Sequence, residues 1–137
     1  VGVQVSGREE SEKLAETLRK HGYPTLDLSD DDLARNHVRH MVGGHAPLVQ
    51  QGDLQELVYR FVFPERPGAL MNFLEKMSSG WNISLFHYRN HGADYGRVLV
   101  GMQVPRSEMQ SFRQFLNTLG YEHWDESDSP VYKLFLG

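Results

Sequence analysis

The sequence predicts an α+β fold, an antiparallel sheet of βαββαβ order with its helices packed on one face and one extra strand at the C-terminus. Two observations carry this prediction. Segments with the two-residue period of a strand alternate with segments that have the helical period. Turn and breaker residues separate these segments. This order of elements is the ferredoxin-like, split βαβ plan.

The first three predicted elements follow one another from residue 57. Large apolar residues occupy every second position of 57–63, which is typical of a half-buried strand. The turn PERPG (64–68) ends this strand. Apolar residues then recur at helical spacing from Leu70 to Met77, and Gly80 ends the predicted helix. Residues 83–89 are rich in aromatic and branched side chains and predict the second strand.

The second half of the plan begins at the turn HGADYG (91–96). Residues 97–104 are the expected antiparallel partner of the preceding strand. Pro105 and Ser107 then open a helix with Met109, Phe112, Leu116 and Leu119 on one face. Two closing strands are predicted, over 121–124 and over 131–136.

An internal repeat divides the chain. VGVQV at 1–5 resembles VGMQV at 100–104, and each is followed by a polar helical stretch that ends in Gly-Tyr, at 22–23 and 120–121. Asp27, Ser29 and Asp30 match Asp125, Ser127 and Asp128. Chance similarity between two strand–helix–strand pieces is the alternative explanation.

The repeat predicts two subdomains, the C-terminal remainder of a first one at 1–46 and a complete second one at 47–137. The chain is therefore expected to begin inside its first copy. That copy should retain a strand at 1–5, a helix near 9–21, a strand near 24–28 and a short helix near 30–41, with 41–47 as the connector.

Composition narrows the function classes. Of the 137 residues 39% are hydrophobic, enough for a real core, and 18 acids outnumber 14 Lys and Arg. A net-acidic chain without a basic run is a poor partner for nucleic acid or an anionic membrane. No apolar stretch reaches the length of a membrane span. The chain has no cysteine, which excludes disulfides and thiolate metal sites and fits a reducing compartment.

The turn at 64–74 is the first candidate binding site. Gly68 lies where a strand passes into a helix, and a residue without Cβ lets a ligand approach the backbone. The free amides of Ala69, Leu70 and Met71 would lie at the positive end of the helix dipole, where they can hold a carboxylate. The alternative is a plain Pro-Gly turn.

The second candidate is the strand segment 81–92. Asn82 offers an amide at its start, able to accept from an ammonium or donate to a carboxylate. Phe86 and Tyr88 share one face of the strand, and His87 lies on the other. The alternative is that one face is core and the other a plain sheet surface.

Metal and catalytic chemistry find little support. His37 and His40 are spaced to share a helix face, but no third ligand has persuasive spacing, which favours solvated or core histidines. The acidic run at 29–32 fits a helix N-cap and first turn rather than a calcium loop. The sequence contains no phosphate-cradling loop, no nucleophile elbow and no lysine in a Schiff-base context.

The segments HVRHMVGGHAP (37–47), FVFPERPGALMNFL (61–74) and WNISLFHYRNHGADYGRVLVGMQV (81–104) resemble the C-terminal regulatory region of biosynthetic threonine dehydratase, also called threonine ammonia-lyase. This region consists of ACT-like subdomains. The resemblance covers essentially the whole chain, and LFHYRNHGADYGRV is its most specific stretch.

The resemblance implies a regulatory fragment with no cofactor of its own. The parent enzyme uses pyridoxal phosphate, in an upstream catalytic domain, to deaminate threonine to 2-oxobutanoate on the route to isoleucine. Isoleucine is implied as the feedback inhibitor and valine as an opposing ligand. The implied location is the cytoplasm, or the plastid in a plant.

The resemblance also implies a ligand site at the first β–α turn and on the second strand, often next to a neighbouring ACT unit. The matching positions are Pro67, Gly68, Ala69, Leu70, Asn82, Ile83, Phe86 and His87. Glu65 stands where the family usually has Asp, which puts the detailed polar contacts in doubt.

Three functions compete at this point: an amino-acid sensor that acts on its own catalytic domain, a structural module that holds a homo-oligomer together, and an autonomous enzyme. The last is disfavoured because the sequence offers no nucleophile, base or cofactor anchor. Stabilisation by isoleucine would separate the first two.

Overall fold

The computed structural model describes residues 3–38, 53–90, 92 and 94–136. Two helices come first, α1 (Arg8–Lys20) and α2 (Asp32–Asn36). The elements that follow are β1 (Leu54–Pro64), α3 (Ala69–Lys76), β2 (Asn82–Asn90), β3 (Tyr95–Pro105), the 3-10 turn η2 (Arg106–Glu108), α4 (Met109–Leu119), β4 (His123–Asp125) and α5 (Pro130–Phe135). From β1 to β4 the order is βαββαβ, which confirms the predicted plan.

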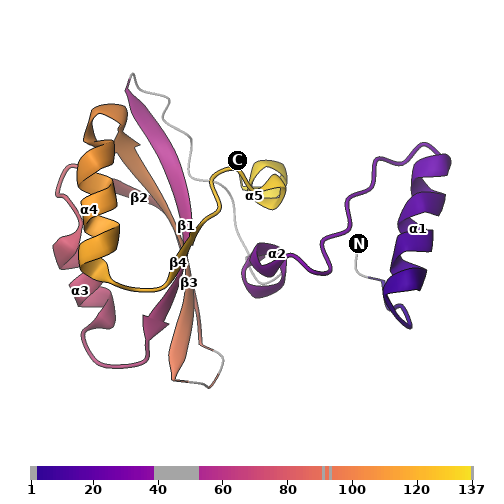
Figure 1. Cartoon of the computed structure of the whole chain (residues 1–137), viewed down its shortest axis with the longest axis horizontal. Helices are drawn as coiled ribbons and strands as arrows, with labels where there is room; N and C mark the ends of the chain where they lie inside the picture. The colour runs from indigo at the N-terminus through magenta and orange to yellow at the C-terminus, as the bar shows by residue number, and fades with distance from the viewer. Residues whose placement is uncertain (1–2, 39–52, 91, 93, 137) are drawn as a thin grey trace.

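The four strands form one antiparallel sheet of order β2-β3-β1-β4 (Figure 1). β1 lies between β3 and β4, and the longest ladder joins it to β3, with Tyr59 opposite Val100. β2 is an edge strand, paired with β3 alone among the described strands. A bulge between Ile83 and Leu85 shifts the register of β2 by one residue.

One face of the sheet, here called the helical face, is covered by α3 and α4 (Figure 1). The odd-numbered residues of β1 and the even-numbered residues of β3 supply its core, as alternation requires. Aromatic rings connect the layers: the Phe73 ring lies 5.4 Å from both the Phe61 and the Phe115 ring. Trp81 is buried beside Phe112 and donates its indole N–H to Glu108 at 2.8 Å.

The opposite face, here called the back face, is covered by the short helices α2 and α5 (Figure 1). A second apolar cluster forms there from α2, α5, β1 and β3, with Leu33, Val58, Leu99, Val131 and Tyr132 buried. Helices therefore pack on both faces, whereas the sequence predicted them on one face only.

The extra C-terminal strand predicted over 131–136 is wrong. Residues 130–135 form α5, with Pro130 at the first helical position. Proline has no N–H to give to a sheet ladder, and its fixed φ suits the first turn of a helix. Val131 and Tyr132 are adjacent and both buried, which a helix allows and the alternation of a strand does not.

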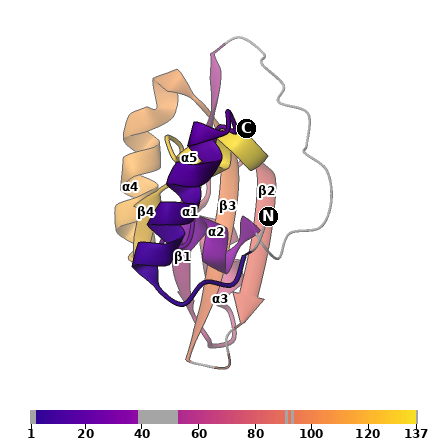
Figure 2. The ribbon, with the colours of Figure 1, turned by 90° about the vertical axis from the view of Figure 1, so that its right-hand side faces the viewer.

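The predictions for the first copy are confirmed only for its helices. α1 covers most of the expected helix, and α2 is a shorter version of the second one, capped by Asp31, whose carboxylate accepts from the Ala34 amide at 2.8 Å. Residues 3–5 and 23–28 form no strand. The connector predicted at 41–47 lies outside the described residues. Figure 2 shows α1, α2 and α5 in front of the sheet.

Candidate functional site

The first β–α turn is built around a glycine in the left-handed conformation. Gly68, with φ 87°, is the N-cap of α3. Its carbonyl accepts from Asn72 at 2.8 Å, while the Ala69 amide bonds back to the Arg66 carbonyl at 3.3 Å. Within the described part of the chain nothing accepts from the amides of Leu70 and Met71. Two of the three predicted amides are thus free at the start of the helix.

Tyr121 fixes this turn to the core of the domain. Its hydroxyl donates to the Ala69 carbonyl and accepts from the Asn72 side chain, each at 3.0 Å. Its ring lies 5.1 Å from the Phe63 ring at the end of β1. The start of α3 is therefore fixed to the core, and the two free amides keep a defined position.

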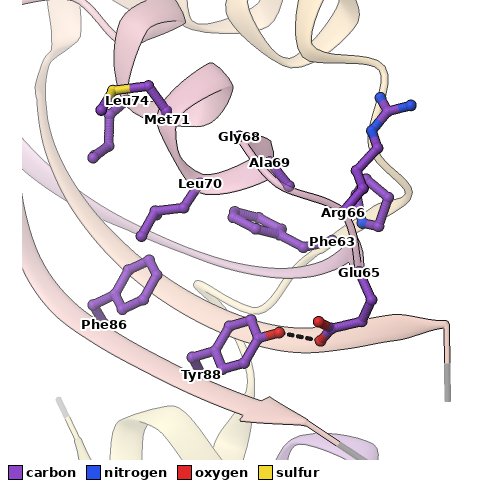
Figure 3. Close-up of a pocket in the computed structure, with 11 residues that line it drawn as sticks. Phe63, Glu65, Arg66, Gly68, Ala69, Leu70, Met71, Leu74, Phe86 and Tyr88 are labelled. Atoms are coloured by element: carbon purple, nitrogen blue, oxygen red, sulfur yellow. Dashed lines mark hydrogen bonds between the residues drawn. The ribbon is translucent and has the colours of Figure 1, made fainter. Parts of the chain in front are cut away.

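An open groove of about 520 Å³ lies between this turn and the edge strand β2 (Figure 3). Its walls are mainly apolar: Leu70, Met71 and Leu74 come from α3, and Phe86 and Tyr88 come from β2. The remaining lining residues belong to the end of β1, the turn and the first position of α3, namely Phe63, Pro64, Glu65, Arg66, Gly68 and Ala69. A groove of this size and lining suits a small, largely apolar ligand.

Glu65 brings a carboxylate to the groove. The Tyr88 hydroxyl donates to it across the gap between the turn and β2 (Figure 3). This hydrogen bond raises the pKa of Tyr88 to about 12, so the phenol stays protonated and keeps donating. Glu65 is exposed, and the oxygen that Tyr88 leaves free can accept from an ammonium group.

The Tyr88 ring lies across Gly96 of β3. A Cβ built on Gly96 would meet the Tyr88 ring and hydroxyl at 2.6 Å, closer than real Cβ contacts come. Because glycine is present, the ring can lie flat on the strand and direct its hydroxyl to Glu65. Gly96 thereby shapes one wall of the groove without lining it.

Four of the eight predicted site residues meet in the groove, namely Gly68, Ala69, Leu70 and Phe86. Pro67 is exposed in the turn and does not line it. Asn82 and Ile83 lie at the far end of β2, opposite Gln103 and Met102. Neither residue lines the groove, although Ile83 lies on the same face of the sheet as Phe86.

His87 is placed on the other side of the sheet. It lies between Phe86 and Tyr88, and strand alternation turns its side chain to the back face, opposite Leu99. There it contacts His37 of α2, with 2.8 Å between the two Nδ1 atoms. His37 is fully buried, which agrees with the core alternative for the histidines, while His40 lies outside the described residues.

The groove also contains residues that the sequence reasoning left out. Tyr88 could have been found, because it lies two residues from Phe86 and so shares its face. Leu74 could also have been found, because it lies one helical turn beyond Leu70. The bond between Tyr88 and Glu65 joins residues 23 positions apart and has no local sequence signal.

The described residues contain no group of three or more His, Cys, Asp or Glu side chains placed to hold a metal ion. No described helix is long and apolar enough to cross a membrane.

The βαββαβ sheet and the groove at its first β–α turn define an ACT-like α+β domain. Residues 49–136 match the family described as the C-terminal regulatory domain of threonine dehydratase. The chain belongs to this family.

Proteins named threonine dehydratase are similar to this chain over nearly its whole length. L-threonine dehydratase biosynthetic IlvA is 53% identical in Burkholderia multivorans and 48% identical in Escherichia coli, each covering 99% of this chain and 26% of the relative. The chloroplastic biosynthetic threonine dehydratase of Arabidopsis thaliana is 43% identical over 99% of this chain and 22% of the relative. The chain thus spans about a quarter of the length of these relatives.

Proposed function

We propose that the groove binds a free branched-chain amino acid, isoleucine as feedback inhibitor and valine as an opposing ligand. Binding would control the deamination of threonine to 2-oxobutanoate by a catalytic domain of the same protein. In this proposal pyridoxal phosphate belongs to that catalytic domain, and this chain's residues sense rather than catalyse. The protein would act in the cytoplasm of a bacterium or the plastid of a plant.

The observation that carries the proposal is the pairing of opposite polar groups at one apolar groove. The free amides of Leu70 and Met71 suit a carboxylate, because the start of a helix favours negative charge. The Glu65 carboxylate suits an ammonium group. Phe63, Leu74 and Phe86 offer apolar surface for an aliphatic side chain. A zwitterionic, aliphatic amino acid carries these three features and no others.

Control of a catalytic domain requires that the ligand binds two conformations with different affinity. The groove is suited to this, because its walls come from separate elements. α3 supplies one wall and the edge strand β2 the other, and the Tyr88–Glu65 hydrogen bond joins β2 to the turn before α3. A ligand that contacts both walls stabilises the arrangement in which they are close.

Calorimetric titration of the chain with isoleucine, valine and threonine tests the proposal. Isoleucine should bind most tightly, and threonine should bind more weakly because its hydroxyl would lose water without gaining a partner among the apolar walls. Leu70→Ala should weaken isoleucine binding about tenfold, since a wall contact worth roughly 1.4 kcal/mol is lost. Leu134→Ala is the matched control, because Leu134 is exposed on α5, away from the groove. Equal isoleucine affinity in the two variants would place the site elsewhere.

A second candidate function is assembly of a homo-oligomer. Ile83, Phe86 and Tyr88 are 36%, 38% and 45% exposed along the edge strand β2, next to the exposed Leu70, Met71 and Leu74 of α3. An edge strand with an apolar margin is a surface for a second copy. Sedimentation across a wide concentration range tests this function, and a monomer throughout would contradict it.

A further inference from the structure

The contact between His37 and His87 joins the first repeat to the back of the groove. His37 is the C-cap residue of α2, and His87 lies on β2 between two residues that line the groove. Their Nδ1 atoms are 2.8 Å apart, and the rings meet edge to face with centroids 5.1 Å apart. The two residues are separated by 50 positions, so the contact links distant parts of the chain.

We propose that His37 is a positioning residue for the amino-acid groove: through a hydrogen bond between neutral imidazoles, it docks α2 behind β2 and fixes the strand that carries Phe86 and Tyr88. The effect on ligand binding rests on the proposed function, whereas the docking of α2 on β2 does not depend on any ligand. The docked state has His37 seated in the back-face cluster beside Leu33, and the released state has α2 detached from β2.

The hydrogen bond restricts the protonation of both rings. Two Nδ1 atoms at 2.8 Å require one N–H and one lone pair. If both rings were protonated, two N–H groups would face each other and two cations would lie side by side. The buried Nε2 of His37 has no hydrogen-bond partner in the described part of the chain, so a proton placed there would have no acceptor.

The surroundings of the pair also oppose a positive charge. Arg60 of β1, Arg89 of β2 and Arg97 of β3 face it, and Arg89 lies opposite Arg97 in the ladder. Three carboxylates lie on this face: Asp32 of α2 and Glu126 after β4 are bonded to Arg60, and Glu56 of β1 accepts from Ser84 of β2 and Tyr132 of α5. Burial first, then His87 and the arginines, lower the pKa of His37 to about 3. Burial and Arg89 also lower the pKa of His87.

These shifts make docking dependent on pH, with a definite sign. The pKa of His37 is depressed in the docked state and returns toward its ordinary value of about 6.5 when α2 is released. Docking is therefore undiminished above pH 6.5, and it weakens as the pH falls, because only the released state takes up the proton. Between pH 7.5 and 5.5 the docking equilibrium should shift about tenfold toward release from His37 alone.

The docking part can be tested without any ligand. The chain has no cysteine, so Ala34→Cys introduces a single thiol on α2, at a position packed against the back-face cluster. Its labelling rate reports release of the helix. The reference is the double variant Ala34→Cys with His37→Asn, measured at the same pH. Because both proteins carry the same thiol, the effect of thiol ionisation on the labelling rate cancels in the ratio of their rates. Asn keeps a polar group near the Nδ1 position without titrating. The ratio of the two rates should rise about tenfold from pH 7.5 to 5.5, and a constant ratio would overturn the docking switch.

The positioning part needs isoleucine titrations at pH 7.5. His37→Leu should weaken isoleucine binding severalfold, His87→Leu should do the same, and the double variant should lose no more than either alone, because both act through one contact. His21→Asn is the control and should not change the affinity for isoleucine, because His21 is an exposed residue at the C-cap of α1. Additive or absent effects would overturn the positioning role. Absence of isoleucine binding in the unmodified chain would instead defeat the proposed function, while the labelling result would still stand.

Discussion

The position of the Tyr88 side chain depends on the absence of a side chain at Gly96. Its ring occupies the space where a Cβ of Gly96 would lie, and from there its hydroxyl donates to Glu65. The clashing atoms belong to the far end of an exposed side chain, which can move. A methyl group at Gly96 should therefore displace the ring rather than unfold the sheet.

We expect Gly96→Ala to lower isoleucine affinity about threefold to tenfold, because the groove loses one wall and the bond to Glu65, worth about 1 kcal/mol. The melting temperature should change little, since β3 tolerates alanine and the displaced ring was already partly in solvent. Titration calorimetry and thermal unfolding measure the two effects separately. Gly80→Ala is the control, because a Cβ there meets only the Ser78 hydroxyl, at 4.0 Å. Unchanged affinity in Gly96→Ala would remove Tyr88 from the site.

The conformation of single residues was predictable where the signal was local. The sequence predicts Gly68 at a strand-to-helix turn, and the structure gives it a positive φ at that position. Phe86 and His87 were assigned to opposite faces of their strand, and alternation placed them so. The contact between His87 and His37 could not be predicted, because 50 residues separate the two and no pattern in either segment refers to the other.

At the scale of elements, the bulge in β2 depends on a second glycine. A Cβ on Gly101 would meet the Ser84 Oγ at 2.6 Å, the Leu85 Cβ at 3.0 Å and the Glu56 Oε1 at 3.3 Å. Ser84 is the extra residue of the bulge and donates to Glu56, which also accepts from Tyr132 of α5. Gly101 thus lies under a polar contact that joins β1, β2 and α5.

We expect Gly101→Ala to lower the free energy of unfolding by about 1–3 kcal/mol, the usual cost of an overpacked site. Unlike the Tyr88 ring at Gly96, the Leu85 Cβ is held by the backbone and cannot swing away. Urea unfolding measures the loss. Adding Ser84→Ala removes the closest clashing atom and should restore part of the stability. A double variant no more stable than Gly101→Ala alone would show that Ser84 is not the source of the strain.

The strands and helices with clear periodicity were predicted, and the misassigned elements lacked it. β1, α3 and α4 have a clear period, and β2 and β3 flank a turn that marks them as neighbouring strands, so the type of these elements was readable. The segment VYKLFL (131–136) alternates weakly, and its apolar residues fit either period. Tertiary packing decided for a helix, because Val131 and Tyr132 together fill the back-face cluster with Leu33 and Val58.

At the scale of the whole molecule, the two short helices α2 and α5 pack on the same face of the sheet. α5 begins 98 residues after α2, the same separation as between the two Gly-Tyr pairs. Leu33 and Val131 occupy equivalent positions in these helices, and both are buried in the same cluster. α2 and α5 thus contribute to one apolar cluster on the back face of a single sheet, an arrangement that sequence similarity alone could not reveal.

Arg60 is the charged residue that connects these parts. It lies in β1 with its side chain 10% exposed, and it donates to Glu126 at 2.9 Å and to Asp32 of α2 at 3.4 Å. Its guanidinium stacks on the Trp124 ring of β4, 4.4 Å from the centroid. The Glu126 side chain is 15% exposed, and Arg60 is the counter-charge it contacts.

We expect Arg60→Met to lower the free energy of unfolding by about 3 kcal/mol, because it leaves the Glu126 carboxylate buried without a counter-charge. Arg35→Met is the matched control: Arg35 also pairs with Asp32, but its side chain is 54% exposed, and such a pair contributes about 0–1 kcal/mol. Adding Glu126→Gln to Arg60→Met removes the uncompensated charge and should recover much of the loss. Urea unfolding of the three variants and the unmodified chain measures each step. If Arg60→Met and Arg35→Met cost the same, the buried Arg60–Glu126 ion pair does not stabilise the fold.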